Sequence, residues 1–415
     1  MRPRAFAACF CLLLAAVPLA PPAARAQHQQ RLQLDEELRF PAGRDTVSLP
    51  FENHGEHLLI HVSVNGGAPL LMVFDTGMPS PGVLLYEGAL VEKLKLTYSP
   101  ARIRVGGAGG EGARQARLAT GVTLRVGALE VGGSVAIVMP ATPQMSGLHD
   151  GIIGASLFQH LVVSLDHDRG VLTLTRRDAF TPPADAAGVP LRIEGRSAYV
   201  PVKLVGADGV ATPLEAILDL GATHAISLNR RSSPAIVAPP GARAARIGRG
   251  MSGVSTGMVG RIPALELGGH RLANVVATFP DTAFEDPRGL DSRSGNLGGG
   301  VLGRFNVALD HGGSRMFVTP NQRFSNPFEW DMSGLQTEIT DAGEIRVAAI
   351  LPDSPAAEAG ISPGELVVAV DGEKPVPRTL LRTRERFREP GRELSLTLRR
   401  DGRERVVRLT LRRLV

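Results

Sequence analysis

Two copies of one short pattern, an apolar run that leads into an aspartate and then a glycine, constrain this chain more than any other feature. The first copy covers residues 70–77 and brings Asp75, and the second covers residues 214–221 and brings Asp219. Such a run predicts a buried strand that delivers its carboxylate to a tight turn, where the glycine lets backbone amides come close. A single copy would indicate only an ordinary turn.

The two aspartates lie 144 residues apart, and a second block repeats at the same offset. Residues 151–167 align without a gap with residues 295–311, and each block holds a glycine at its first and fourth positions. A repeat of this length predicts two similar lobes, each with one Asp-x-Gly turn, rather than a solenoid of small units.

The repeated turn, followed in each lobe by the second block, resembles the two-lobed aspartic proteases of the pepsin and retropepsin type. In that family each lobe threads the second block through a loop beneath the first, and the two aspartates meet between the lobes. The resemblance implies two acid-protease β-barrel lobes, at residues 45–180 and 190–322. The residues agree, because 48 glycines and 31 prolines among short Val, Leu and Ile runs favour a mostly β chain with a linker at 181–190.

The resemblance also implies a reaction, the hydrolysis of peptide bonds in protein or peptide substrates by an aspartic endopeptidase. Asp75 and Asp219 would share one proton and activate a water, with no cofactor and no metal. We expect Thr76 to brace the lobe interface. Gly77 and Gly221 are expected to present backbone N–H groups to the carboxylates.

The second copy departs from the family pattern at Leu220, where Thr or Ser normally hydrogen-bonds across the lobe interface. Losing one such bond costs about 1 kcal/mol, or more if a buried amide is left unpaired. This departure supports the alternative of a catalytically inactive two-lobed peptide-binding or scaffold protein of the cell envelope. A third alternative keeps the enzyme active, with Leu220 adapted to an apolar core.

Several other patterns have simpler interpretations. The glycine-rich stretch 104–112 lies where the family carries a hairpin over the cleft, and residues 246–253 hold the matching place in the second lobe. Residues 295–299 resemble the nucleophile loop of trypsin-like serine proteases, but Leu297 stands where the serine would be. His54, His57 and His61 are more readily interpreted as surface or strand polar positions than as metal ligands.

The C-terminal segment, residues 332–415, resembles a PDZ domain of the type found in bacterial proteases. The resemblance rests on Ser-Pro-Ala-Ala-Glu-Ala-Gly-Ile at 354–361 and on the run at 364–372 that ends in Asp-Gly. PDZ domains bind an extended peptide as an added strand, with backbone amides capturing its terminal carboxylate. Residues 379–388 would form one wall of that groove. The candidate carboxylate loop consists of Ser333, Gly334, Leu335 and Gln336.

The N-terminus predicts secretion, because residues 1–26 combine early arginines, an apolar stretch and an Ala-Arg-Ala site. Cleavage after Ala26 would remove both cysteines, Cys9 and Cys11, and would lower the formal charge from +5 to +2. The remaining arginines are scattered among acids, so nucleic acid is not an expected partner. We expect a monomer in the periplasm or outside the cell, with no membrane-spanning segment after cleavage.

Overall fold

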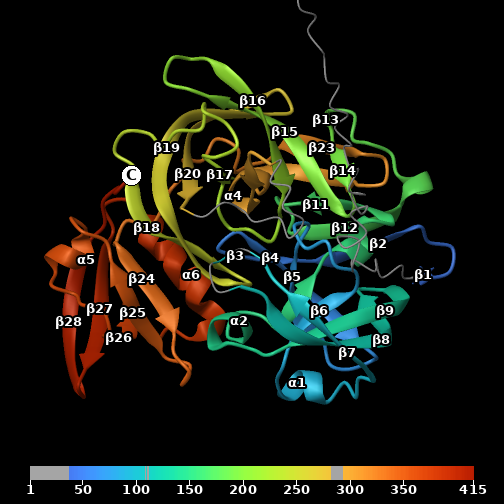
Figure 1. The fold of residues 1–415 in the computed structure, drawn as a ribbon, viewed down its shortest axis with the longest axis horizontal. Helices are drawn as coiled ribbons and strands as arrows, with labels where there is room; N and C mark the ends of the chain where they lie inside the picture. The colour runs from blue at the N-terminus through green and yellow to red at the C-terminus, as the bar shows by residue number, and fades with distance from the viewer. Residues whose placement is uncertain (1–36, 108, 110–111, 282–292) are drawn as a thin grey trace, which may run out of the picture. The chain divides into compact units, whose positions relative to one another are not determined.

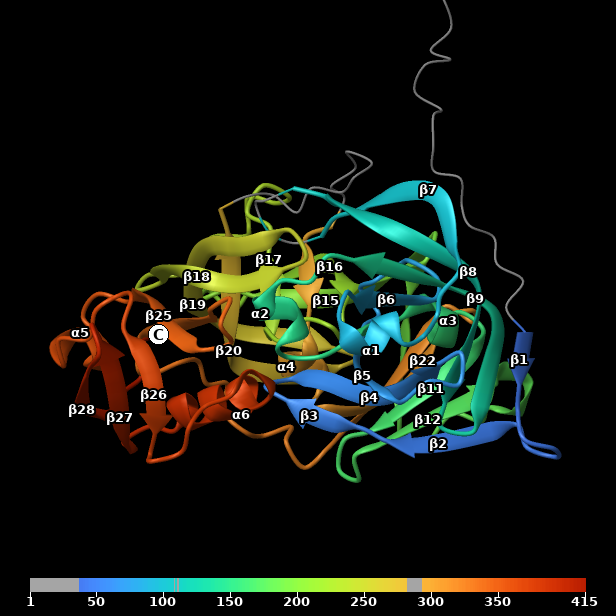
Figure 2. The ribbon, with the colours of Figure 1, turned by 90° about the horizontal axis from the view of Figure 1, so that it is seen from below.

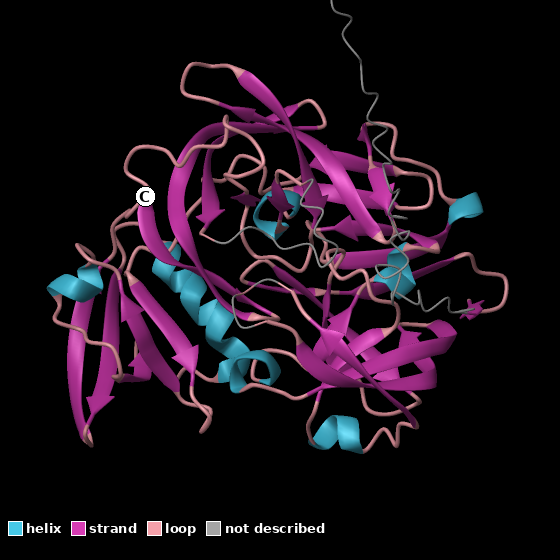
Figure 3. Ribbon diagram, in the orientation of Figure 1, coloured by secondary structure: helices cyan, strands magenta, loops and turns pink. Residues whose placement is uncertain are grey.

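The computed structural model describes residues 37–107, 109, 112–281 and 293–415, and its fold is mostly β (Figures 1 and 3). The predicted signal peptide, residues 1–26 with Cys9 and Cys11, lies outside the described residues. Within the described ranges, no helix is long and apolar enough to cross a membrane.

The first lobe is a closed β-barrel. Its strands follow the order β9-β6-β10-β5-β4-β8, and the barrel closes because β8 also pairs with β9. Val, Leu, Ile and Phe side chains fill the interior, and the central strands β6 and β10 are buried along their whole length. The elements of this lobe are β1 (Glu37–Arg39), β3 (Glu52–His54), β4 (His57–Val64), β5 (Leu70–Phe74), β6 (Val83–Tyr86), α1 (Ala89–Glu92), β7 (Tyr98–Val105), β8 (Arg114–Val126), β9 (Leu129–Met139), α2 (Pro143–Ser146), β10 (Gly151–Ile153) and α3 (Ala155–Phe158).

The second lobe repeats this barrel strand for strand. The order β20-β17-β21-β16-β15-β19 closes because β19 also pairs with β20, as β8 pairs with β9 in the first lobe. Its elements are β14 (Arg192–Glu194), β15 (Ser197–Val205), β16 (Ala211–Leu218), β17 (Ile226–Leu228), β18 (Arg243–Gly250), β19 (Gly253–Leu267), β20 (His270–Pro280), β21 (Gly295–Leu297) and α4 (Gly299–Leu302).

A six-stranded sheet with the order β13-β23-β22-β11-β12-β2 joins the two lobes. Its central pair is β11 with β22, in which Val163 faces Leu309 and Leu165 faces Val307. One apolar cluster therefore runs from the first lobe through this sheet into the second. The sheet contains β2 (Thr46–Pro50), β11 (Leu161–Asp166), β12 (Val171–Arg176), β13 (Ala187–Pro190), β22 (Phe305–Asp310) and β23 (Arg315–Pro320), and the 3₁₀ turn η1 (Arg177–Ala179) follows β12.

The linker predicted at residues 181–190 is only partly a linker. Its last four residues form β13, which pairs with β23 from Ala187↔Val318 to Pro190↔Arg315. The Pro- and Gly-rich composition concealed this strand, because an edge strand tolerates proline.

The C-terminal domain is a five-stranded sheet with its own apolar core and the strand order β24-β25-β26-β27-β28. The α6 helix lies beside β24 (Figure 1). Gly360 has a positive φ and follows α5, as the sequence pattern predicts for a helix end. The elements are β24 (Leu335–Ile339), β25 (Ile345–Ile350), α5 (Pro355–Glu358), β26 (Leu366–Val370), η2 (Pro377–Thr379), α6 (Leu380–Glu385), η3 (Arg386–Arg388), β27 (Glu393–Arg400) and β28 (Arg403–Thr410).

Candidate active site

The β5 strand delivers Asp75 to the turn that the sequence predicts. The strand lies parallel to β10, and the backbone N–H of Asp75 donates to Ile153 O at 2.9 Å. The Asp75 carboxylate accepts hydrogen bonds at Oδ1 from the backbone N–H groups of Gly77 (2.7 Å) and Met78 (3.1 Å). A β-carbon at Gly154 would lie 2.3 Å from Asp75 O, so the glycine of the second block is needed for this close crossing.

The second lobe builds the same turn from β16 and β21. The Asp219 N–H donates to Leu297 O at 3.0 Å, and Gly221 N–H donates to Asp219 Oδ1 at 3.0 Å. At the matching crossing, a β-carbon at Gly298 would lie 2.2 Å from His224 O. Both lobes therefore present one carboxylate held by the backbone of its own turn.

The two turns meet across the lobe interface, each glycine against the opposite aspartate. A β-carbon at Gly77 would lie 2.6 Å from Asp219 Cγ, and one at Gly221 would lie 2.3 Å from Asp75 Cγ. Real β-carbons do not approach other atoms this closely, so a side chain at either position would have to displace the opposite carboxyl. The structure thus brings together Asp75, Asp219, Gly77 and Gly221.

Thr76 reaches from the first lobe to the backbone of the second. Its Oγ1 donates to Leu218 O at 2.9 Å and accepts from Leu220 N–H at 3.0 Å. Leu220 offers no hydroxyl in return, and its side chain is 3% exposed within the central apolar cluster. One threonine therefore makes both side-chain bonds between the two turns, where a symmetric site would use two hydroxyl residues.

Asn296 distinguishes the two carboxylates. It lies on β21, and its Nδ2 donates to Asp219 Oδ2 at 2.6 Å. His224 Nε2 lies 3.1 Å from Asn296 Oδ1 and holds the amide in place. The matching position in the first lobe is Ile152, which has no polar side-chain atom, so only Asp219 has a side-chain amide of this kind beside it.

The pKa of Asp75 is also shifted by its surroundings. Burial, the charge of Asp219 and a hydrogen bond to Asp219 raise the pKa of Asp75 well above its usual range, against the smaller opposing effect of the Gly77 and Met78 amides. Two adjacent carboxyls cannot both ionise cheaply, so one proton is shared between them. The raised pKa of Asp75 places the shared proton preferentially on that residue.

His57 is a polar residue on a strand, as the sequence predicts, and it also borders the dyad of Asp75 and Asp219 on its Asp219 side. It is the first residue of β4, where burial lowers its pKa to about 4 while the charge of Asp219 and the backbone of Gly221 oppose the shift. Its ring meets that of His149 edge-on at 6.1 Å. Burial and the charge of His57 lower the pKa of His149 to about 3.

Two hairpins, one from each lobe, contact each other through Gly107 and Ser252, and their strands can be followed in Figure 2. They are β7–β8 and β18–β19, the places predicted by the glycine-rich stretches. Gly107 N–H donates to Ser252 Oγ at 3.1 Å, and a β-carbon at Gly107 would lie 3.0 Å from Met251 Cβ. Residues 108, 110 and 111 of the first stretch lie outside the described residues.

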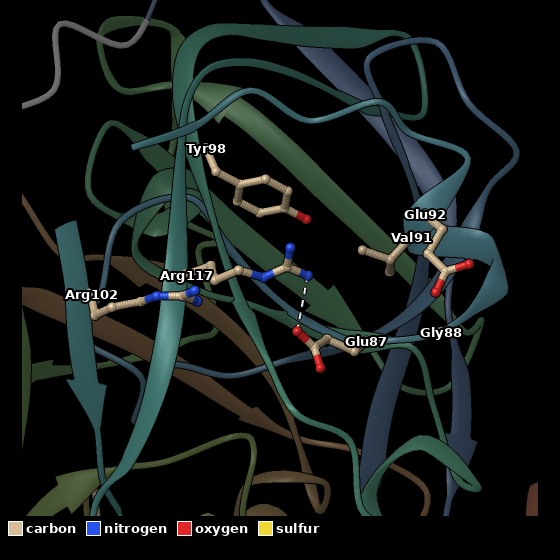
Figure 4. Close-up of a pocket in the computed structure, with 7 residues that line it drawn as sticks. All are labelled: Glu87, Gly88, Val91, Glu92, Tyr98, Arg102 and Arg117. Carbon is tan, nitrogen blue, oxygen red and sulfur yellow. Dashed lines mark hydrogen bonds and ion pairs between the residues drawn. The ribbon is translucent and has the colours of Figure 1, made fainter. Parts of the chain in front are cut away.

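A pocket at the base of the β7–β8 hairpin contains none of the dyad residues (Figure 4). Arg117 spans it, with its guanidinium carbon 4.1 Å from the centre of the Tyr98 ring and Nη2 2.9 Å from Glu87 Oε1. These contacts fix the base of the hairpin to the end of β6. The pocket is lined by Glu87, Gly88, Val91, Glu92, Tyr98, Arg102 and Arg117.

The loop before β24 uses its amides within the domain. Asp331 Oδ1 accepts from the N–H groups of Ser333 (3.0 Å) and Gly334 (2.8 Å), and Ser333 Oγ accepts from Leu335 N–H at 3.0 Å. The Gln336 side chain donates to Arg246 O at 3.3 Å. The role of these four residues in ligand binding stays a prediction. In the described ranges, no group of three or more His, Cys, Asp or Glu side chains is placed to hold a metal ion.

The comparisons with known proteins agree with this geometry. A family model described as aspartyl protease matches residues 60–157, which include Asp75 and β10, and a PDZ domain model matches residues 346–400. The predicted fold class is confirmed, as mostly β with a C-terminal PDZ domain. None of the curated proteins matches the chain.

Among solved structures, the chain is similar to an aspartic proteinase from Irpex lacteus, with 14% identity and a TM-score of 0.43. The similarity covers 68% of this chain and 99% of that one. A likeness this weak does not bear on the function.

Proposed function

We propose that the chain is an aspartic endopeptidase that acts on protein or peptide substrates through Asp75 and Asp219. The observation that carries this proposal is the meeting of the two carboxyls, each against the opposite glycine. The matched family model supports a protease-like domain in the first lobe. The secreted or periplasmic location predicted from residues 1–26 belongs to the same proposal.

The asymmetry of the dyad assigns the two roles. Ionised Asp219 accepts a proton from a water between the carboxyls, and the resulting hydroxide attacks the scissile carbonyl carbon. Protonated Asp75 donates its proton to the carbonyl oxygen, which gives a tetrahedral diol. The C–N bond then breaks as Asp219 returns a proton to the leaving amine and the diol returns one to Asp75, so no covalent enzyme adduct forms.

Cleavage of casein by matched variants tests the proposal. Asp75→Asn and Asp219→Asn should each abolish cleavage, because each removes one carboxyl from a pair that must share a proton. Asp208→Asn is the control, since Asp208 lies in an exposed turn and its Oδ1 contact to Val210 N–H survives in the amide. Near-normal turnover in either dyad variant, with unchanged circular dichroism, would contradict the proposal.

A catalytically inactive peptide-binding protein is the second candidate, and Leu220 favours it. Because Leu220 lacks a hydroxyl, the two Asp-x-Gly turns are joined by one hydroxyl side chain, that of Thr76, instead of two. The same experiment separates the candidates, since an inactive protein would leave casein intact in the parent chain while still binding it.

A further inference from the structure

The open edge of the PDZ sheet is already hydrogen-bonded. The β24 strand lies at one edge of its sheet, and a PDZ ligand binds by adding a strand to such an edge. Thr337 and Ile339 lie two residues apart, so their carbonyls point to the same side of β24. Arg384 Nη2 donates to Thr337 O at 2.6 Å, and Gln144 Nε2 donates to Ile339 O at 2.6 Å.

The first of these donors belongs to the groove itself. Arg384 lies on α6, the opposite wall, and also donates to Thr337 Oγ1 at 2.9 Å. Its side chain therefore crosses the space between α6 and β24, and an incoming strand has to displace it from Thr337 O.

The second donor comes from the first lobe. Gln144 lies on α2, and the residues that follow it are fixed to the same domain: Arg378 donates to Leu148 O at 3.2 Å and pairs with Asp150. A β-carbon at Gly147 would lie 2.9 Å from Pro377 Cβ. The segment from Gln144 to Asp150 thus contacts β24 through one side chain, and it contacts the residues just before α6, Pro377 and Arg378.

In the loop that would bind the C-terminal carboxylate of a ligand, the backbone N–H groups of Ser333, Gly334 and Leu335 already have acceptors within the domain. Asp331 supplies a carboxylate from within the domain and takes the N–H groups of Ser333 and Gly334, while Leu335 N–H donates to Ser333 Oγ. A terminal carboxylate would have to replace Asp331 against its negative charge. An internal peptide segment has no terminal carboxylate, so it can bind without replacing Asp331.

We propose that the groove between β24 and α6 binds an extended internal segment of a polypeptide, and that this segment binds by displacing Gln144 from Ile339 O. The first lobe thus already occupies one hydrogen-bond acceptor of the β24 edge, Ile339 O. The ligand competes with a contact inside the chain, so removing that contact strengthens binding. The proposal concerns binding alone and does not depend on proteolytic activity.

Two pools of randomised dodecapeptides test the proposal. Each pool is passed over the immobilised full chain, which carries Asp75→Asn to prevent cleavage. One pool has free C-termini and the other is amidated. Gln144→Ala should retain roughly two- to tenfold more peptide than the background chain, the gain expected from removing one competing hydrogen bond. The gain should be equal for both pools, and hydrogen exchange should slow at residues 335–339 when peptide is added.

Two further variants make the outcome decisive. Gln144→Glu keeps the size of the side chain but loses the donor, so it should show the same gain. Gln322→Ala, at an exposed position, should show none. The proposal would be overturned if the Gln144 and Gln322 variants retained equal amounts of peptide. It would also be overturned if neither variant retained any peptide. Preferential retention of the free-carboxylate pool would overturn it too, because it would indicate capture of a chain end.

Discussion

Gly77 faces Asp219 so closely that a β-carbon at position 77 would lie 2.6 Å from the Asp219 carboxyl carbon. Gly221 stands in the same relation to Asp75, at 2.3 Å. The glycine of each turn therefore does more than permit the turn of its own lobe. It sets the separation of the two carboxyls, because the opposite aspartate occupies the place of its missing side chain.

Gly77→Ala and Gly221→Ala should each lower casein turnover by about 100-fold, the effect of displacing a reacting group by roughly 1 Å. The added methyl group must move a carboxyl that the backbone of its own turn holds. Gly88→Ala is the control, since no atom lies within 4 Å of its β-carbon position. Turnover within a factor of two of the parent in both variants would show that the carboxyls do not act at this separation.

Asn296→Ile should lower kcat/KM for casein by about tenfold to 100-fold, because it removes the donor to Asp219 Oδ2. The change also makes the second lobe match Ile152 of the first. A hydrogen bond to a charged group contributes about 1.5–3 kcal/mol, and each 1.4 kcal/mol corresponds to a factor of ten. A kcat/KM within a factor of two of the parent would indicate that Asn296 only packs against the dyad.

Stability should fall as the pH drops from about 6.5 to 4, because buried histidines are held neutral. Burial lowers the pKa of His57 to about 4, that of His149 to about 3 and that of His167 to about 4. A histidine whose pKa is lower in the folded state stabilises the fold above its unfolded value of about 6.5 and loses that contribution as the pH falls through the folded value.

His167 offers a test of this pH dependence away from the dyad. Its ring packs edge-on against Phe51 at 5.3 Å, and its buried Nε2 has no hydrogen-bond partner. His167→Leu should therefore reduce the difference in melting temperature between pH 7.5 and pH 4.5, whereas His61→Leu, at an exposed position, should not. An equal pH dependence in both variants would contradict the explanation.

The sequence predicted the fold because its signals were local and repeated. Each apolar run that ends in Asp-x-Gly became a barrel strand, and the blocks repeated at the 144-residue offset became β10 and β21, the parallel neighbours of those strands. The strand β13 was missed, since its sequence Ala-Gly-Val-Pro reads as a linker and only pairing with β23 makes it a strand.

The parts of the site that the sequence did not predict depend on contacts between distant strands. Asn296 was noticed only within a loop like that of serine proteases, and its bond to Asp219 spans 77 residues. His57 lies beside Asp219 because the second lobe packs against the start of β4. The sequence of β4 alone does not indicate this contact. The one available signal was that Asn296 breaks the repeat, because Ile152 stands at the matching place.

Thr76→Val should lower the free energy of unfolding by about 1–3 kcal/mol for each buried backbone group left unpaired. The threonine hydroxyl serves both Leu218 O and Leu220 N–H, so one substitution removes both cross-lobe bonds. Thr76→Ser keeps the hydroxyl and should retain most of the stability. Urea unfolding of the two variants measures the difference, and equal losses would mean that the hydroxyl does not hold the lobes together.

Leu220→Thr decides between two explanations of the departure from the family pattern. If the site is weakened by a missing hydroxyl, the threonine should raise turnover with little loss of stability. The structure favours an adapted core, because the Leu220 side chain is 3% exposed within the central cluster and Thr76 already bonds to both backbone groups of the second lobe. Burying a hydroxyl there and losing apolar contact should cost about 1–3 kcal/mol.

We therefore expect Leu220→Thr to lower the melting temperature without raising casein turnover, with both measured on one preparation. Leu220→Val is the matched control, since it removes a methylene group without adding a polar atom and should cost less. A rise in turnover at unchanged stability would restore the missing hydroxyl as the cause of any weak activity. It would also mean that the hydrogen bonds of Thr76 alone do not hold the two carboxyls rigidly enough for full activity.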